Sequence, residues 1–557
     1  MDEQLPPAVD TVDQPRPGIL HRRSSRRALL IGSATLAAGG AAIAVVSVAA
    51  QSGPEKKTST VTNVASDGGA AATTAAPAAA KTAAALSSTP ITDARKRAAH
   101  LLRRAGFGGS AAEIEAFSAL SREEAASRLV DFEKIDNAAL EKRIAAANLT
   151  LRYGPDARGQ AIQDMQRWWL MRMAYTARPL EERMTFIWHG LLTSQVTKVG
   201  PQRSYWLVVQ NELFRAHALG KYDDLVQAVA KDPAMMTYLD TVESTKEHPN
   251  ENFPREVMEL FTMGVGAYTE DDIRESSRAF TGWRLSAPDR PVIPANATEA
   301  QKKQIQLAAI AAYDPAYRFQ ARLHDDGQKT FLGKTGNWGG EDILKIIMEQ
   351  PATGRFITTR LFREFAYDNP EPAVIDRLVK VWNSSGHDTR EVVRSILTSD
   401  EFYSEKAYFA KVRSPIEMIV GVIRGLELES AFELASGGRG KGSGFYAGMD
   451  QVLFEPPNVA GWPGGTAWLS SSTFFARANF LDQVFFARGK STIVPALKNA
   501  ATPETLVDEA ARRLIDSSLP DPSRSALVAH LTTIKDAQER AATAAYLLAG
   551  SPEFQLI

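Results

Sequence analysis

The chain contains no cysteine, and this absence excludes several kinds of chemistry at once. Disulfides, thiolate nucleophiles, cysteine-ligated zinc, iron–sulfur clusters and c-type haem attachment all require that residue. Histidine is also scarce, with eight among 557 residues. Any metal would therefore depend on histidine, carboxylate, amide or backbone oxygen ligands. The sequence leaves a divalent metal open without identifying one, and the cofactors are otherwise unknown.

An excess of charge of either sign is missing as well. The chain has 64 basic and 65 acidic residues, for a formal net charge of −1. Proteins that bind nucleic acid usually carry a basic excess or a basic stripe, so no nucleic-acid partner is expected. The chain also lacks G-x-S-x-G, H-E-x-x-H and dinucleotide-binding motifs. Their absence disfavours the common hydrolase and dehydrogenase classes.

The first fifty residues have the features of an export signal. Arg26-Arg27 precedes an uncharged and weakly apolar run from Ala28 to Ala50, a pattern similar to the twin-arginine signal. A retained membrane anchor is the alternative, because the run is just long enough to span a bilayer. Residues 51–90 are rich in Ala, Thr, Ser and Pro and predict a disordered linker. We therefore expect an extracellular or cell-envelope protein that meets the membrane only through its N-terminal segment.

From residue 91 to residue 557 the apolar residues recur at helical spacing. This pattern predicts a mainly α fold, a large multi-helix domain, with an insertion at 286–312. Strand signals are few, and the clearest runs from Tyr317 to Gly333, where Asp326-Gly327 is a typical hairpin turn. The fold class is therefore a helical domain with one small β-hairpin.

Residues 250–283, NENFPREVMELFTMGVGAYTEDDIRESSRAFTGW, contain the densest pattern in the chain. They predict a helix capped by Asn252 and stopped by Gly264, then a second helix begun at Thr269. The polar side of the first helix carries Arg255, Glu256 and Glu259. This side is either a solvated charged face or a carboxylate-rich pocket ordered by Arg255. The preceding loop supplies Asn250 as a candidate binding residue.

Two histidines outside this segment are candidate acid/base groups or ligands. His189 ends a predicted helix after Phe186, Ile187 and Trp188, where the helix dipole alone would explain a histidine. His324 lies beside the Asp326-Gly327 turn, with Lys329 nearby as a binding candidate. Turn chemistry explains the aspartates there but leaves the histidine unexplained. We expect His189, His324 and Glu256 to share a cleft, as acid/base or metal-assisted hydrolysis requires.

The run FEPPNVAGWPGGTAWLSS holds candidate binding residues on a stiff loop, namely Asn458, Trp462 and Trp468. Exposed Trp and Asn side chains would suit contact with a carbohydrate or a peptide. Buried Trp side chains would instead fix the loop onto the core. The sequence alone favours neither alternative.

Six segments occur in an order that identifies a resemblance: AAHLLRRAGFGGSAAEI, MTFIWHGLLTS, the segment 250–283, HDDGQKTFLGKTG, RSPIEM and FEPPNVAGWPGGTAWLSS. Together they resemble the bacterial family called domain of unknown function 1800, from about Ala94 to Leu556. The family has no settled activity. The resemblance implies an exported protein, often encoded beside a sulfatase-like family that would supply a partner. Pro254 departs from the family pattern, where alanine is common, and so puts the orientation of Asn252 in doubt.

Two functional classes stay open from the sequence. The first is an exported hydrolase, metal-assisted or not, that acts on an envelope or extracellular polymer through the histidines, Arg255 and the carboxylates named above. The second is a non-catalytic binding or assembly protein that works with a secreted sulfatase-like partner. Whether the protein is an enzyme depends on how these side chains converge in the folded chain.

Overall fold

The computed structural model describes residues 89–153, 160–288, 290–437, 445–516 and 519–557. All described residues belong to one unit, Ala72–Ile557. The predicted signal at 1–50 and nearly all of the predicted linker lie outside the described residues. Within the described part of the chain, no helix is both long enough and apolar enough to cross a membrane.

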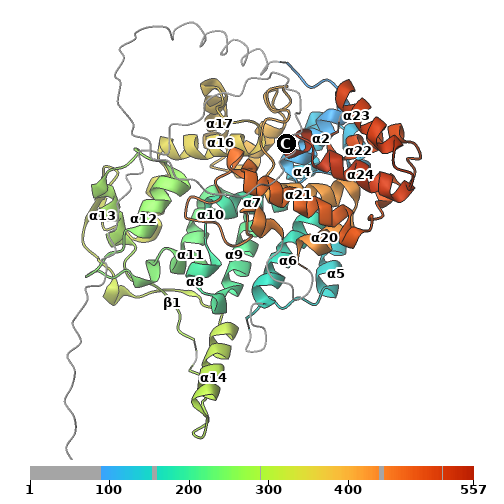
Figure 1. The fold of residues 1–557 in the computed structure, drawn as a ribbon. Coiled ribbons are helices and arrows are strands. Elements are labelled where there is room, and N and C mark those ends of the chain that lie inside the picture. The colour runs from blue at the N-terminus through green and yellow to red at the C-terminus, as the bar shows by residue number, and fades with distance from the viewer. Residues whose placement is uncertain (1–88, 154–159, 289, 438–444, 517–518) are drawn as a thin grey trace, which may run out of the picture. The chain divides into compact units, whose positions relative to one another are not determined.

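The prediction of a mainly α fold is confirmed. The described residues form 23 helices and two small two-stranded antiparallel sheets (Figure 1). The first ten helices precede the central segment: α2 Ala94–Ala105, α3 Ala111–Ser118, α4 Arg122–Val130, α5 Ala138–Ala146, α6 Gln160–Tyr175, α7 Pro179–Leu191, α8 Val196–Val199, α9 Tyr205–Ala216, α10 Tyr222–Ala230 and α11 Pro233–Tyr238.

The middle of the chain holds short helices and all four strands. They are α12 Asn252–Glu256, a π-helix at Val257–Thr262, α13 Glu270–Ala279, β1 Trp283–Leu285, α14 Glu299–Ala312, β2 Tyr317–Phe319, β3 Lys329–Phe331 and β4 Lys334–Gly336. Helices then continue to the end: α15 Gly340–Met348, α16 Pro351–Phe365, α17 Pro372–Ser384, α18 Thr389–Leu397, α19 Pro415–Leu426, α20 Glu429–Ala435, α21 Ser471–Phe485, α22 Pro503–Leu514, α23 Asp521–Thr532 and α24 Ala537–Ala549.

Local sequence explains many of the helix starts. In α3 and α4 a serine before the helix accepts the backbone N–H three residues on, and a glutamate at that position returns a bond to the serine backbone. This capping box satisfies two backbone donors that the first turn leaves without partners. The apolar faces of the helices then form one core, in which Trp169 and Trp188 are fully buried.

The strands pair differently from the hairpin predicted for Tyr317–Gly333. β1 pairs with β2, and β3 pairs with β4, both antiparallel. The hairpin is therefore β3–β4, closed by Leu332 and Gly333, which both have positive φ as a two-residue hairpin turn favours. Asp326-Gly327 forms a turn between β2 and β3, which are not partners. The prediction of a small hairpin was correct in kind and wrong in position.

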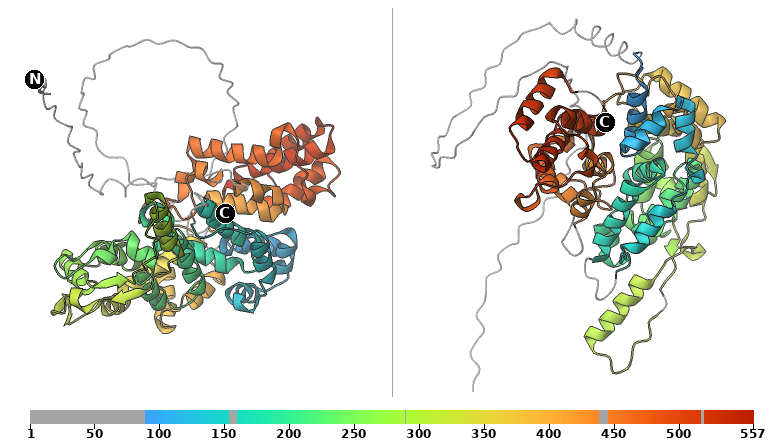
Figure 2. Two further views of the ribbon diagram at one scale, coloured as in Figure 1. Left: turned by 90° about the horizontal axis from the view of Figure 1, so that it is seen from below. Right: turned by 90° about the vertical axis from the view of Figure 1, so that its right-hand side faces the viewer.

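The predicted insertion forms an arm between two paired strands. β1 and β2 hydrogen-bond to each other at its base, and α14 projects away from the neighbouring helices in Figure 1 and in the right-hand view of Figure 2. The ladder brings the ends of the insertion together, so the arm interrupts the sequence without disturbing the helices on either side.

The segment Tyr403–Arg413 holds both ends of the described chain. The backbone N–H of Ile91 donates to the carbonyl of Tyr403 at 2.8 Å, and that of Glu405 donates to Thr89 at 2.8 Å. Ile557 and Lys411 exchange two backbone hydrogen bonds, of 2.8 and 3.1 Å. One short segment therefore pairs with the entry and with the last residues of the helical unit.

Candidate functional site

The central segment folds as two helices joined by a glycine turn, as its sequence predicts. Gly264 has φ of +82°, in the left-handed region, and follows the first helix. Thr269 caps α13 by accepting the N–H of Asp272, whose carboxylate accepts the N–H of Thr269 at 2.8 Å. The helix stop and the helix start are therefore both confirmed.

The predicted cap by Asn252 is not what the structure shows. Asn252 is the first residue of α12, and its side-chain amide donates to Asp240 at 3.2 Å. The side chain of Asn250 instead accepts the backbone N–H of Asn252 at 2.8 Å. Both predicted binding residues thus order the loop before α12. Asn250, and not Asn252, is the residue whose side chain accepts a backbone N–H at the start of the helix.

The last turns of the first helix form a π-helix, a feature that periodicity did not predict. The N–H groups of Met263 and Gly264 both donate to the carbonyl of Met258 at 3.0 Å. The Thr262 hydroxyl donates to the carbonyl of Val257. Short π-helical segments occur frequently at functional sites. Here the wider turn ends directly before the glycine that leads into α13.

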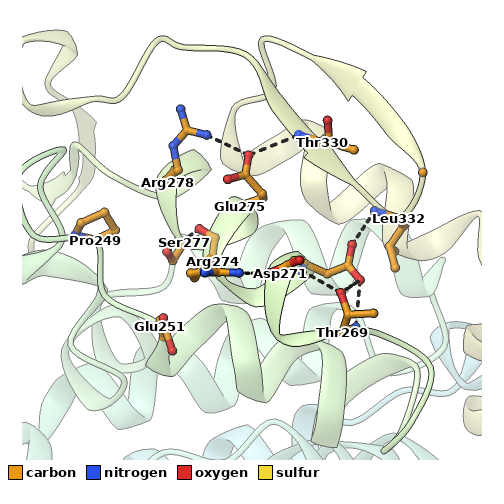
Figure 3. Close-up of a pocket in the computed structure, with 12 residues that line it drawn as sticks. Pro249, Glu251, Thr269, Asp271, Arg274, Glu275, Ser277, Arg278, Thr330 and Leu332 are labelled. Atoms are coloured by element: carbon orange, nitrogen blue, oxygen red, sulfur yellow. Dashed lines mark hydrogen bonds and ion pairs between the residues drawn. The ribbon is translucent and has the colours of Figure 1, made fainter.

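An open groove lies over α13 and is lined largely by two of the segments that carry the family resemblance (Figure 3). Its volume is about 880 Å³. The lining comes from the loop before α12, from α13 and from the β3–β4 hairpin: Pro249, Glu251, Thr269, Asp271, Asp272, Arg274, Glu275, Ser277, Arg278, Thr330, Leu332 and Gly333. Four carboxylates and two arginines are therefore among the residues that line the groove.

Both groove arginines are already paired with carboxylates. Arg278 donates to Glu275 at 2.8 Å and makes a two-pronged contact with Asp325, at 2.7 and 3.1 Å. The Arg278 guanidinium holds the pKa of the Asp325 carboxyl below its usual value. Arg274 forms an exposed ion pair with Asp271. These pairs also use the charges of Asp271 and Glu275, so the excess of lining carboxylates over lining arginines consists of Glu251 and Asp272.

Arg255 does not line the groove but holds the lining residue Glu251 in place. Its guanidinium donates to both oxygens of Glu270, at 3.0 and 2.9 Å, and to the groove residue Glu251 at 3.1 Å. The hydrogen bond to Glu270 is the largest cause of a raised pKa for Arg255. A solvated ion pair of this kind contributes only about 0–1 kcal/mol to stability. Its main effect is to hold the start of α12 against the start of α13.

The hairpin is attached to α13 by backbone donors. The N–H of Leu332 donates to Asp272 at 2.8 Å, and the N–H of Thr330 donates to Glu275 at 3.2 Å. Figure 3 shows Thr330 and Leu332 reaching toward α13 from above it. Asp272 therefore caps its own helix and also fixes the hairpin, which closes one side of the groove.

Lys329 is buried and acts as an internal support for the turn beside the hairpin. Its ammonium donates to the carbonyls of Asp325 at 2.6 Å and of Gly327 at 3.0 Å. Burial lowers its pKa. The side chain predicted to bind a ligand thus satisfies two backbone acceptors that would otherwise lack partners.

The two candidate histidines lie in different surroundings. His324 is half-buried, with Nδ1 2.9 Å from the carbonyl oxygen of Thr281 and its ring 5.1 Å from the ring of Phe319. His189 is 1% exposed, and burial lowers its pKa to about 3. Its ring contacts the aromatic rings of Trp169, Phe454 and Trp462, with centroids 5.1 to 5.6 Å apart. An imidazole enclosed in this way stays neutral at physiological pH.

Trp462 and Trp468 attach the proline-rich loop to the helices. Trp462 stacks on Phe186 with ring centroids 5.7 Å apart, and Trp468 is 3% exposed. A Cβ on Gly461 would overlap the carbonyl oxygen of Gly190, so only glycine permits this approach. Asn458 is exposed, and its side chain accepts the backbone N–H of Ala460 at 2.9 Å. Of the two alternatives for this loop, the tryptophans take the one in which they pack against the core.

The carboxylates of the first helix have separate roles. Glu259 accepts a hydrogen bond from the Tyr268 hydroxyl at 2.9 Å. Glu256 is half-buried and, with Glu455, adds negative charge near Tyr238. Burial is the larger cause that raises the pKa of Tyr238 to about 12, and the two carboxylates add to it. None of the predicted site residues is among those that line the groove, and Arg255 contacts its wall through Glu251.

No group of three or more histidine, aspartate or glutamate side chains that could hold a metal ion occurs among the described residues. Sequence reasoning also overlooked the residues that line the groove, Glu251, Asp271, Asp272, Glu275 and Arg278. The sequence analysis predicted where α13 begins but assigned no site to its acids. A repeat at helical spacing was the available signal, because Asp271 and Glu275, like Arg274 and Arg278, recur one turn apart on one face.

Comparison with known proteins adds a family and no activity. Neither a search of curated proteins nor a search of solved structures found a match to this chain. The family model described as protein of unknown function, DUF1800, matches residues 100–556, which include the groove, its supporting ion pairs and the proline-rich loop. The chain therefore belongs to the DUF1800 family.

Proposed function

We propose that this protein is an exported envelope or extracellular protein that binds an amine-bearing segment of a polymer in the groove over α13. The single observation that carries the proposal is the charge balance of the groove. Its four lining carboxylates exceed its two arginines, and both arginines already pair with carboxylates. A groove with this excess attracts positively charged groups and disfavours anionic ones.

Export supports the choice of ligand. The Arg26-Arg27 signal and the Ala/Thr/Pro-rich stretch after it suit a protein that works outside the cytoplasm. Amine-bearing polysaccharides and peptides are polymers that an exported protein meets there. We also propose that the sulfatase-like partner implied by the family resemblance binds the same polymer. Co-purification of the two proteins from the envelope fraction would test this partnership.

The binding test compares two oligomers of equal length, one with free amines and one in which every amine is N-acetylated and therefore uncharged. A glucosamine pentamer carries free amines, whereas the N-acetylglucosamine pentamer of the same length is neutral. The amine form should bind in calorimetry with an affinity that falls as salt rises, and the acetylated form should not bind. Equal binding of the two oligomers would refute the charge argument.

Variants locate the binding. Glu251→Gln with Asp271→Asn removes two groove charges, and each exposed ion pair to a ligand contributes about 0.2–1 kcal/mol. The double variant should therefore weaken binding by roughly 2- to 30-fold. Glu299→Gln is the matched control, because Glu299 is an exposed glutamate on α14 that pairs only with Lys302 among the described residues. An equal loss in the control would place the binding elsewhere.

Hydrolysis is the second candidate, favoured by one observation. Glu251 and Glu275 come from separate elements and lie on either side of Ser277 in Figure 3. Two carboxylates that flank a bond are what glycosidase chemistry requires. If the groove is hydrolytic, mass spectrometry should detect shortened oligomers, and Glu275→Gln should abolish them while binding persists. Intact oligomers after prolonged incubation would leave the binding role alone.

A further inference from the structure

A second cavity, unrelated to the groove, is enclosed where α2, α19 and α22 meet. Its volume is about 10 Å³, close to what one water-sized or halide-sized occupant requires. Glycines along its wall let the arginines approach the backbone closely. Gly421 and Gly425 lie one turn apart on α19, and Gly108 and Gly109 follow α2. A Cβ on Gly421 would overlap Nη1 of Arg413, and a Cβ on Gly425 would lie 3.0 Å from the carbonyl oxygen of Arg513.

The polar lining of this cavity is mainly cationic. Arg103, Arg413 and Arg513 contribute guanidinium groups, and Asp516 contributes the only lining carboxylate among the described residues. Arg103 pairs with Asp516, and Arg513 donates to Glu509 at 2.7 Å. Two of the three arginines are therefore neutralised by carboxylates of the protein.

Arg413 is the exception. It is 2% exposed, and its Nε has no hydrogen-bond partner in the described part of the chain. Its Nη2 donates to the carbonyl of Leu556 at 3.3 Å, and its guanidinium lies 4.0 Å from the centre of the Phe554 ring. The carboxylate whose charge acts on it, Glu417, is itself paired with Arg183. Arg413 thus keeps its charge inside the core without a carboxylate of its own.

The arginines also repel one another there. Burial first, and then the charge of Arg103, lowers the pKa of Arg413 to about 9. Arg103 is 3% exposed; its Nη1 contacts Asp516, whereas its Nε and Nη2 have no hydrogen-bond partner among the described residues. Burying a charge is costly unless an opposite charge and hydrogen bonds compensate it. A small anion could accept hydrogen bonds from the donors without partners and could offset the charge of Arg413.

We infer that this cavity binds one monovalent, halide-sized anion, chloride in physiological salt, between the guanidinium groups of Arg103 and Arg413. The anion would accept hydrogen bonds from donors that the protein leaves unused and would offset the charge of Arg413. Asp516 opposes an anion, but its charge is taken up by Arg103.

The first test uses the unaltered protein. Thermal unfolding is followed while chloride or bromide replaces gluconate at constant ionic strength. A ligand that binds only the folded state raises Tm in a saturable manner, here by about 2 °C. Sulfate at equal ionic strength provides the comparison for nonspecific salt effects, which do not saturate. A Tm that is the same in gluconate, chloride and bromide would overturn the inference.

Crystals of the unaltered protein grown in bromide test for a bound anion without any variant. An anomalous peak between Arg103 and Arg413 is expected. A water molecule in that position, or an empty cavity at high bromide concentration, would overturn the inference.

A pair of variants completes the test. Arg413→Gln should abolish the halide-dependent rise in Tm. Arg524→Gln should retain it, because Arg524 forms an ion pair with Asp508 that is well exposed to solvent. If Arg413→Gln does not fold, the melting curves and the bromide crystals of the unaltered protein still test whether the cavity binds an anion.

Discussion

The replacement of Asp232 by asparagine should make the protein more stable at neutral pH, although it removes a charge that caps a helix. Asp232 is 2% exposed and precedes α11. Its Oδ1 accepts hydrogen bonds from the backbone N–H of Met235 at 2.9 Å and from the side chain of Gln210 at 2.7 Å. Its Oδ2 has no partner among the described residues. An asparagine keeps the accepting oxygen and caps helices equally well.

The magnitude follows from the pKa. Burial raises the pKa of Asp232 from 3.8 to about 7, so the folded protein binds a proton that the unfolded chain releases near pH 4. Stability is therefore lost as the pH rises from about 4 to about 7, where the unfolded state binds fewer protons than the folded one. A shift of about three pKa units corresponds to a change on the order of 4 kcal/mol.

The Asp232→Asn variant should not show this decrease in the free energy of unfolding as the pH rises. The two proteins should have similar stability near pH 4, and the variant should be more stable at pH 8 by up to that amount. Urea unfolding at several pH values measures the difference. Glu181, whose pKa burial also raises to about 7, is present in both proteins and cancels in the comparison. Parallel stability curves for the two proteins would refute the argument that Asp232 is protonated in the fold.

Asp508→Asn provides a control of opposite sign. Asp508 is exposed and paired with Arg524, which lowers the pKa of Asp508. Its contribution is present above the unfolded pKa and is lost as the pH falls through the folded one. That variant should therefore differ from the unaltered protein in the opposite direction, by losing stability at neutral pH and converging with it at acid pH.

Two further predictions concern the glycine turn and export. Gly264→Val should lower the free energy of unfolding by at least about 1 kcal/mol, because φ is +82° and a Cβ would lie 3.1 Å from the Phe356 ring. Gly266→Val is the matched control for backbone strain alone, since φ is +89° and nothing lies within 4 Å of its Cβ; equal losses would exclude a role for Phe356. Arg26→Lys with Arg27→Lys should leave precursor in the cytoplasm, as immunoblots of cell fractions would show. Normal export of that double variant would contradict the twin-arginine assignment.

Local sequence was sufficient to predict where α13 begins and where the preceding helix ends, but not which elements pack against them. The helix cap at Thr269 and the stop at Gly264 depend on residues within one turn, and both predictions were correct. The pairing of β1 with β2 depends on contacts across an inserted arm, so the Asp326-Gly327 turn gave a misleading local signal. Turn residues indicate where the chain bends, but they do not show whether the strands on either side of the bend pair with each other.

The same limit applies to the candidate site. His189 lies in the last turn of a helix, as its sequence predicts, yet its burial results from Trp169 on α6 and from Phe454 and Trp462 on a distant loop. The start of α13 at Thr269 was predicted from sequence, but the backbone N–H groups that Asp272 and Glu275 accept from the β3–β4 hairpin were not. Only the folded chain combines these residues with Glu251 into a groove.

The segment Tyr403–Arg413 has a mechanical consequence. A pull on the chain at residue 89 is transmitted first to the backbone hydrogen bonds that join Thr89 and Ile91 to this segment. The same segment holds Ile557 through two backbone hydrogen bonds, so tension entering at one end of the helical unit is borne beside the other end. The groove over α13 lies on other elements. A force applied at residue 89 is therefore borne by the backbone hydrogen bonds of the segment Tyr403–Arg413. The helices that line the groove are not part of that segment.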